Sequence, residues 1–206
     1  MMASDYSWYG LTDRSDTGVD TDQNWHADFE ERYCCSSCNY RKPELSHEPI
    51  DIKTVERPPL APIVVQHENS VHILLRSFLE LFEDVLDDSV LMGKVYGPDN
   101  KTYDQFVTVT TCHMLPIRGT KESLFKICST CKRPNYYPMP FNYGYVTVDS
   151  LKPGRLLYIH RLEPLVIRSD LLSRIDAKTR RRLRITELPV KTEAEDGIED
   201  FPTLYM

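Results

Sequence analysis

The sequence lacks the features of a membrane or secreted protein. No window approaches the roughly 18 uninterrupted apolar residues that a membrane-spanning helix needs. The segment Met1–Thr21 is polar and acidic, without the apolar stretch of a secretory signal. We therefore expect a cytoplasmic protein with no membrane partner. In a reducing compartment, the 6 cysteines are more typical of metal ligands or buried thiols than of disulfides.

The motifs of the common enzyme classes are missing as well. The chain contains no G-x-S-x-G, P-loop, G-x-G-x-x-G or H-E-x-x-H pattern. Its histidines have no metal-ligand spacing, and we interpret them as surface or core residues: His26, His47, His67, His72, His113 and His160. The sequence therefore predicts a protein that is not an enzyme. An active site assembled from distant residues is the least favoured alternative.

An excess of basic charge is also missing. Lys and Arg total 25 against 31 Asp and Glu, which gives a net charge of −6 and argues against nucleic acid as the main partner. One basic run, Lys178 to Arg184, falls in the last turns of a predicted helix, where cations complement the helix dipole. Phosphate, nucleic acid or an acidic protein surface are the alternative partners of this run.

Two short cysteine motifs are the most informative feature that is present. They are Cys35-Ser-Ser-Cys38 and Cys128-Ser-Thr-Cys131, which we call the first and the second knuckle. Four thiolates from two such turns make a closed tetrahedral site for zinc, with no position left for water or substrate. The sequence therefore predicts one structural Zn²⁺ held by Cys35, Cys38, Cys128 and Cys131.

The separation of the knuckles is unusual, because zinc ribbons place about 15–20 residues between their two pairs. Closing a loop as long as the one from Cys38 to Cys128 costs roughly 4 kcal/mol. A structural zinc contributes on the order of 10–16 kcal/mol. The metal therefore outweighs the loop, provided that the strands bring the knuckles together.

Two details of the knuckles leave alternatives open. Glycine usually follows the second cysteine, where the backbone is left-handed, but Asn39 and Lys132 stand there. Asn tolerates that conformation better than Lys, so loss of the metal in this chain is an alternative. Cys34 lies beside Cys35 and could replace it as a ligand, although the spacing favours Cys35.

Hydrophobic periodicity predicts two main helices and several short strands. The first helix begins at Ser70 and continues to Leu86, and the second runs from Ser169 to about Leu183. A polar stretch from Thr12 to Asn24 is predicted to be a loop. Strands are predicted at residues 6–11, 90–96, 106–111, 124–127, 143–148, 156–159, 166–167 and 185–190, with 90–96 and 106–111 forming a hairpin.

The tyrosine-rich and proline-rich segment after the second knuckle has two interpretations. Its aromatic residues either form a protein-binding surface or pack over the knuckle as a small core. They are Tyr136, Tyr137, Phe141, Tyr143 and Tyr145.

These elements predict a single α+β domain over residues 1–190. It would contain a small, mostly antiparallel sheet, two main helices and a discontinuous, zinc-ribbon-like four-cysteine site. Residues 191–206 carry five acidic side chains and no periodicity, which predicts a flexible C-terminal tail.

The chain resembles the bacterial double-CXXCG motif proteins, a family of myxobacterial and planctomycete type. The resemblance is carried by Tyr6–Leu11, both knuckles with Lys132 and Arg133, Leu151–Arg161, and the segment from Val166 to Val190. Several members are immunity proteins against contact-delivered toxins. The resemblance implies that the four knuckle cysteines are metal ligands, and it transfers no catalytic residue.

We therefore expect a non-enzymatic protein-binding module with a structural zinc. Its partner would be a bacterial toxin encoded by a neighbouring gene, which it neutralises. Complementary potentials between an acidic protein and a basic effector would speed their encounter. The alternative is a zinc-ribbon adaptor that binds nucleic acid or the transcription and translation machinery.

Overall fold

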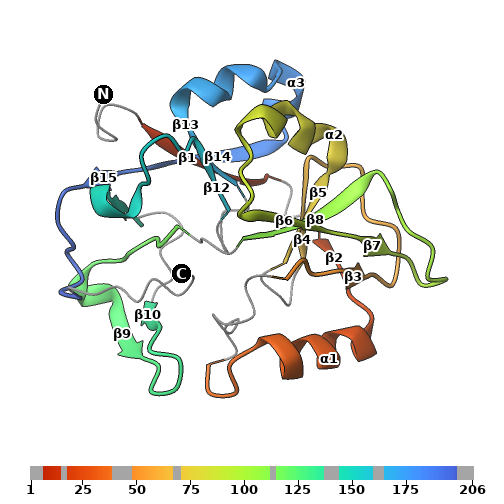
Figure 1. Ribbon diagram of the computed structural model, residues 1–206, viewed down its shortest axis with the longest axis horizontal. Coiled ribbons are helices and arrows are strands. Elements are labelled where there is room, and N and C mark those ends of the chain that lie inside the picture. The colour runs from red at the N-terminus through yellow and green to blue at the C-terminus, as the bar shows by residue number, and fades with distance from the viewer. Residues whose placement is uncertain are drawn as a thin grey trace.

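The computed structural model describes residues 7–14, 18–38, 48–66, 71–111, 115–136, 144–159 and 165–198. Within these residues the chain forms two larger β-sheets, three two-stranded pairs and several short helices (Figure 1). The mixed α and β class and the mostly antiparallel pairing agree with the sequence prediction. The strands, however, are divided between sheets and do not make one small sheet.

The four-stranded sheet joins the beginning of the chain to its end. Its order is β12 (Leu157–Tyr158), β13 (Leu165–Arg168), β1 (Trp8–Asp13) and β14 (Leu183–Leu188). Every pair is antiparallel, and β1 lies between two C-terminal strands. The strands predicted near residues 6–11, 156–159, 166–167 and 185–190 are therefore confirmed, with shifts of a few residues at their ends.

The five-stranded sheet is built from the middle of the chain. Its order is β2 (Gly18–Val19), β4 (Ile63–Gln66), β5 (His72–Leu75), β8 (Phe106–Thr111) and β6 (Val90–Gly93). The predicted hairpin is confirmed, because β6 pairs antiparallel with β8. β2 falls in the stretch that was predicted to be a loop.

Three pairs of short strands lie outside these sheets. β9 (Leu124–Ile127) and β10 (Pro134–Tyr136) form an antiparallel hairpin that carries the second knuckle. β3 (Ile52–Lys53) pairs with β7 (Val95–Tyr96), and β11 (Val146–Thr147) pairs with β15 (Val190–Lys191), both in parallel.

One hydrophobic core connects the two larger sheets. Side chains from both sheets and from the short helices pack in it, including Leu11 of β1, Leu74 of β5 and Phe82. Burying each such side chain contributes about 1.5–3 kcal/mol. The two sheets are therefore parts of one packed body.

The first predicted helix is wrong at its N-terminal end. Val71 is buried, and it leads directly into strand β5, which is bonded on both sides to β4 and β8. A central strand is apolar on both faces, so its run of apolar residues matches a helical period by accident. Helix appears only after the strand, in α2 (Arg76–Leu79) and the 3-10 helix η3 (Glu80–Val85), where Phe78 and Phe82 are buried.

The second predicted helix is also divided. A 3-10 helix, η6 (Ser169–Arg174), is followed by α3 (Ala177–Arg180), and strand β14 begins at Leu183. Asp176 begins α3, because its carboxylate accepts hydrogen bonds from the backbone amides of Lys178 and Thr179. Ser169, the predicted cap, is instead the first residue of η6, whose cap position is Arg168 and which has no side-chain cap bond.

The longest described helix was not predicted. α1 (Gln23–Tyr33) begins after Asp22, whose side chain accepts hydrogen bonds from the amides of Asn24 and Trp25. Its large apolar residues are three aromatic side chains four residues apart, and only Phe29 is buried. α1 leads directly into the first knuckle.

Part of the segment expected to be a flexible tail packs on the domain. Asp196 is buried, and its carboxylate accepts two hydrogen bonds from Arg118, at 2.8 and 2.9 Å. The backbone amide of Glu195 donates to the Tyr145 hydroxyl at 2.6 Å. Composition gave no sign of these contacts, which hold residues up to 198 against the segment that precedes β9.

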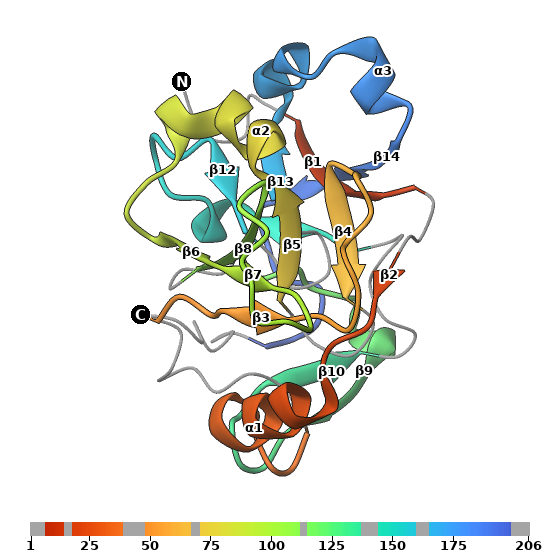
Figure 2. The ribbon, with the colours of Figure 1, turned by 90° about the vertical axis from the view of Figure 1, so that its right-hand side faces the viewer.

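Helix α1 and the β9–β10 hairpin lie side by side at one end of the molecule (Figures 1 and 2). Helices α2 and α3 lie at the opposite end. In the part of the chain that the structure describes, no helix has the length and apolar character needed to cross a membrane.

Candidate metal centre

The first knuckle is positioned by the end of α1. The backbone amide of Cys34 donates to the Glu30 carbonyl at 3.0 Å, which closes the last turn of the helix. The chain then becomes extended and turns over residues 36–38, where the Cys38 amide donates to the Cys35 carbonyl at 3.3 Å. This turn places Cys35 and Cys38 on the same side of the loop.

The second knuckle is the tip of the β9–β10 hairpin. The amide of Cys128 donates to the Arg133 carbonyl, and the amide of Lys132 donates to the Cys128 carbonyl, at 2.8 and 2.9 Å. The strand predicted at residues 124–127 delivers this knuckle as expected. The hairpin fixes its backbone independently of the first knuckle.

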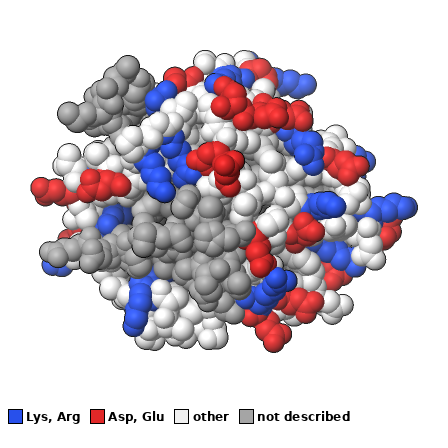
Figure 3. Space-filling model, viewed as in Figure 1, with Lys and Arg blue, Asp and Glu red and all other residues white. Residues whose placement is uncertain are grey.

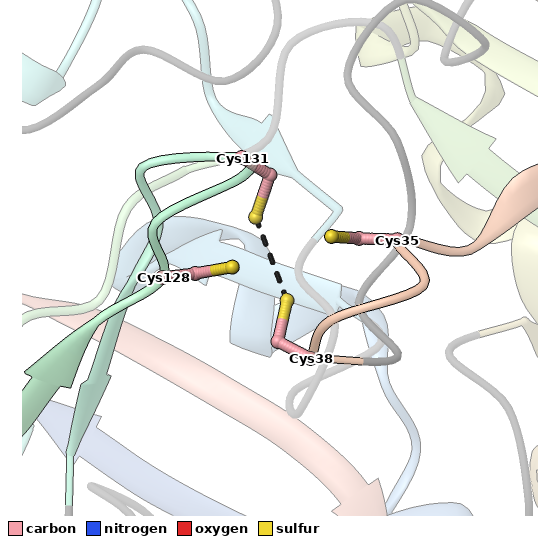
Figure 4. A group of neighbouring side chains, drawn as sticks. All are labelled: Cys35, Cys38, Cys128 and Cys131. Atoms are coloured by element: carbon pink, nitrogen blue, oxygen red, sulfur yellow. Dashed lines mark hydrogen bonds between the residues drawn. The ribbon is translucent and has the colours of Figure 1, made fainter.

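The two knuckles meet although 93 residues separate Cys38 from Cys131. The sulfur atoms of Cys35, Cys38, Cys128 and Cys131 point toward one another (Figure 4) and all lie within 4.8 Å. The Ser37 and Thr130 hydroxyls form a further hydrogen bond of 2.6 Å between the knuckles. The predicted set of four cysteines is therefore brought together.

The sulfur spacing fits a metal better than a disulfide. The Sγ atoms of Cys38 and Cys131 are 3.5 Å apart, whereas a disulfide bond is about 2.05 Å long. A tetrahedron with Zn–S bonds of about 2.3 Å places its sulfurs roughly 3.8 Å apart. None of the four thiols is in a disulfide, and their sulfurs already lie close to that arrangement.

The backbone favours thiolate at one position in each knuckle. Hydrogen bonds from the amides of Cys131 and Thr130 lower the pKa of Cys128 to about 6. The Ser37 amide likewise lowers the pKa of Cys35. Burial raises the pKa of Cys131, which leaves it less ready to ionise than Cys35 or Cys128 without a cation. A cation among the sulfurs would offset that burial cost, as thiolate sites for soft metals require.

Cys34 does not belong to this group. Its side chain is buried in a small apolar cluster with Phe29, Ile50 and Val71. The geometry thus places Cys35, and not Cys34, among the four sulfurs that lie together. Cys34 instead anchors the end of α1.

Within the described residues, no other group of three or more His, Cys, Asp or Glu side chains is placed to hold a metal ion. The His26 Nε2 atom lies 3.5 Å from the Glu30 carboxylate on α1, and His72 is buried in β5. Cys112 and His113 lie outside the described residues. Four cysteines near one another can hold a metal ion, and four protein ligands would leave no coordination position for a substrate.

The missing glycine of the second knuckle leaves a mark on the backbone. Lys132 has φ = 59°, in the left-handed region of backbone conformation that residues other than glycine rarely adopt. This conformation costs about 1–2 kcal/mol for an ordinary residue. Asn39, the corresponding residue of the first knuckle, lies outside the described residues.

We expect Lys132→Gly to raise the free energy of unfolding by about 1 kcal/mol, because glycine adopts a positive φ without strain. Urea unfolding measures this gain. Asn100→Gly is the control, since Asn100 has φ = 61° but tolerates it better, and its gain should be smaller. A loss of stability in Lys132→Gly would mean that the Lys132 Nζ bond to the Ser129 carbonyl outweighs the strain.

The aromatic segment after the second knuckle is described only in part. Tyr145 is fully buried, and its hydroxyl accepts the hydrogen bond from the Glu195 amide. Tyr137, Phe141 and Tyr143 lie outside the described residues. Tyr145 is therefore not part of an exposed binding surface, and its hydrogen bonds are with Arg118 and Glu195.

No protein-family model matches this sequence, and no curated protein is similar to it.

Proposed function

We propose that this protein is a non-enzymatic protein-binding module with one structural zinc ion, and that it acts as an immunity protein neutralising a bacterial toxin. The convergence of four cysteine sulfurs within 4.8 Å is the observation that carries the metal part of this proposal. Tetrahedral sulfur sites select zinc or iron. Zinc is favoured because it has no redox chemistry and serves purely structural sites. The resemblance to double-CXXCG proteins supports the immunity role.

An acidic surface supports a basic protein as the partner. The stretch 80–88, on η3 and the turn after it, carries five exposed acidic residues and no basic one: Glu80, Glu83, Asp84, Asp87 and Asp88. Figure 3 shows acidic side chains at that end of the molecule, with Lys and Arg side chains beside them. Asp84 and Asp87 pair with Arg174 and Arg155, so part of this negative charge is offset. Glu80, Glu83 and Asp88 add three further negative charges, which would steer a partner of opposite charge and speed association.

Two arginines of the basic run are bonded within the domain. The Arg180 guanidinium donates to the carbonyls of Ile175 and Leu172, and the Arg182 guanidinium donates to the Leu60 carbonyl. Lys178, Arg181, Arg182 and Arg184 are nevertheless exposed. The observation that favours a basic partner over nucleic acid is therefore the net charge of −6, and not the basic run.

The partner hypothesis is tested by mixing the purified protein with the product of each neighbouring gene and measuring complex formation by gel filtration. A stable complex with a toxic product, and loss of its toxicity, is expected. Failure with every neighbouring gene product would remove the immunity role.

Association kinetics test the acidic surface separately. Glu83→Lys should slow association at low salt by about threefold, because one steering charge is reversed. Glu187→Lys, an equally exposed change on β14, is the matched control. Equal rates for both variants would place the contact elsewhere.

A further inference from the structure

A pocket of about 370 Å³ lies between helix α1 and the segment that precedes β3. Its volume is within the usual range for ligand pockets, about 300–1,000 Å³. α1 lines it with Trp25, Asp28, Phe29, Arg32 and Tyr33, and the opposite wall is residues 48–51. The four-cysteine site does not take part in this pocket.

The α1 side of the pocket is an aromatic row. Trp25, Phe29 and Tyr33 are spaced one helical turn apart, and their rings stack with centroids 5.1 and 5.3 Å from each other. Phe29 is buried at the centre, and the outer two rings are partly exposed. The Trp25 indole N–H donates to the Asp51 carbonyl at 3.0 Å, which fixes that ring.

At the Tyr33 end of the pocket, the guanidinium group of Arg32 lies over the Tyr33 ring. The Arg32 guanidinium lies 4.9 Å from the centre of the Tyr33 ring, and it also donates to the Glu48 carboxylate at 2.7 Å. The Tyr33 hydroxyl donates to the same carboxylate. A ring face and a carboxylate thus hold one cation between them, an arrangement that stabilises guanidinium and ammonium groups.

The Trp25 end repeats these parts without the cation. The exposed carboxylate of Asp28 lines the pocket beside Trp25, and Asp51 stands on the facing wall. Among the described residues, none places a cation over the Trp25 ring or forms an ion pair with Asp28. The lining carries Asp28, Glu48 and Asp51 against Arg32, that is −3 and +1, or −2 in total.

We propose that the Trp25 end of this pocket binds an arginine or lysine side chain of a protein partner. The guanidinium or ammonium group would lie against the Trp25 ring and pair with the Asp28 carboxylate, as Arg32 does with Tyr33 and Glu48. Tryptophan is the best aromatic partner for a cation. This inference rests on the proposed function, because it names the site at which a basic protein partner would be bound.

The test uses the full chain and a capped Gly-Arg-Arg-Gly peptide, followed by the two tryptophan indole signals in ¹H–¹⁵N NMR spectra. The Trp25 signal should shift as the arginine peptide is added, and the shift should reach a plateau when the site is saturated. The Trp8 signal should not, because Trp8 is buried in a separate core cluster. A capped Gly-Gln-Gln-Gly peptide should leave both signals in place.

A matched pair of variants tests the carboxylate. Asp28→Asn should weaken peptide binding about threefold, as expected for one partly exposed ion pair. Asp149→Asn removes the same charge from the 3-10 helix η5 (Val148–Ser150), where Asp149 is exposed and does not line the pocket, and should leave the affinity unchanged. Equal effects of both variants, or no shift of the Trp25 signal, would overturn the proposal.

Choline is the competing ligand in a third arm. If choline bound more tightly than the arginine peptide, the proposal that the pocket binds a partner's side chain would be overturned. The pocket would then be assigned to a small quaternary ammonium compound. Because no toxin is present in these titrations, the pocket and the immunity role can fail independently. If the peptide bound but no complex with a toxin formed, the proposal for the pocket would stand and only the immunity role would be contradicted.

Discussion

Replacing Cys128 by serine is expected to reduce the bound zinc from one ion per chain to near zero. It should also lower the free energy of unfolding by at least about 3 kcal/mol. A structural zinc contributes on the order of 10–16 kcal/mol in small domains that depend on it entirely. The loss here should be smaller, because the core between the two large sheets does not involve the knuckles. Elemental analysis and urea unfolding measure the two effects.

Cys34→Ser is the matched control for this experiment. It makes the same chemical change at the neighbouring cysteine, whose side chain packs with Phe29 and Val71 and not with the other sulfurs. It should keep one zinc per chain, although the buried hydroxyl will cost some stability. Equal zinc loss in both variants, or wild-type protein without any metal, would contradict the site.

Hydrogen exchange separates a local effect of Cys128→Ser from a global one. Amides of β9 and β10 should exchange faster in the variant, because the hairpin tip loses its connection to the first knuckle. Amides of β5 and β8, which are central strands of the five-stranded sheet, should exchange at wild-type rates. A coloured protein would indicate that the site binds iron instead of zinc. The proposal of a four-cysteine metal site would then stand, with a different metal.

The site was predictable from the sequence because its signal is chemical. Two C-x-x-C motifs indicate which four cysteines could hold a metal ion whatever fold surrounds them, and the structure brings the four predicted sulfurs together. The supporting contact between Ser37 and Thr130 was not predictable. It depends on how two hairpin-like turns from distant parts of the chain face each other, which no local pattern encodes.

Secondary structure was predictable where the local signal was unambiguous. The alternation and β-branched residues of β8 and the short β9 indicated strands correctly. The run from Val71 to Leu75 failed because a doubly paired strand and a buried helix are both continuously apolar. α1 was missed because most of its residues are polar or charged, and its aromatic row covers only a narrow stripe.

Replacing Asp196 by alanine is expected to lower the free energy of unfolding by about 3–5 kcal/mol, as measured by urea unfolding. The side chains of Asp196 and Arg118 are only 0% and 7% exposed. The Arg118 Nη1 donates to both carboxylate oxygens and to the Ile198 carbonyl. Removing the carboxylate leaves a buried guanidinium without its counter-charge, which is the costly way to break a buried ion pair.

Glu193→Ala is the control, because Glu193 is an exposed carboxylate of the same acidic segment. It should change stability by less than about 0.5 kcal/mol. If Asp196→Ala behaved like Glu193→Ala, the segment would be detached in solution, as its composition alone suggested.

The double replacement Arg118→Met with Asp196→Leu decides what the ion pair contributes. Removing both charges avoids the buried unpaired guanidinium, so much of the loss in Asp196→Ala should be recovered if burial of a charge is its cause. The lost bond to Ile198 and the changed packing would remain. If the double variant were as unstable as Asp196→Ala, the charges of the pair would not explain the loss. The pair would then act by holding the C-terminal segment against Tyr145 and the segment that precedes β9.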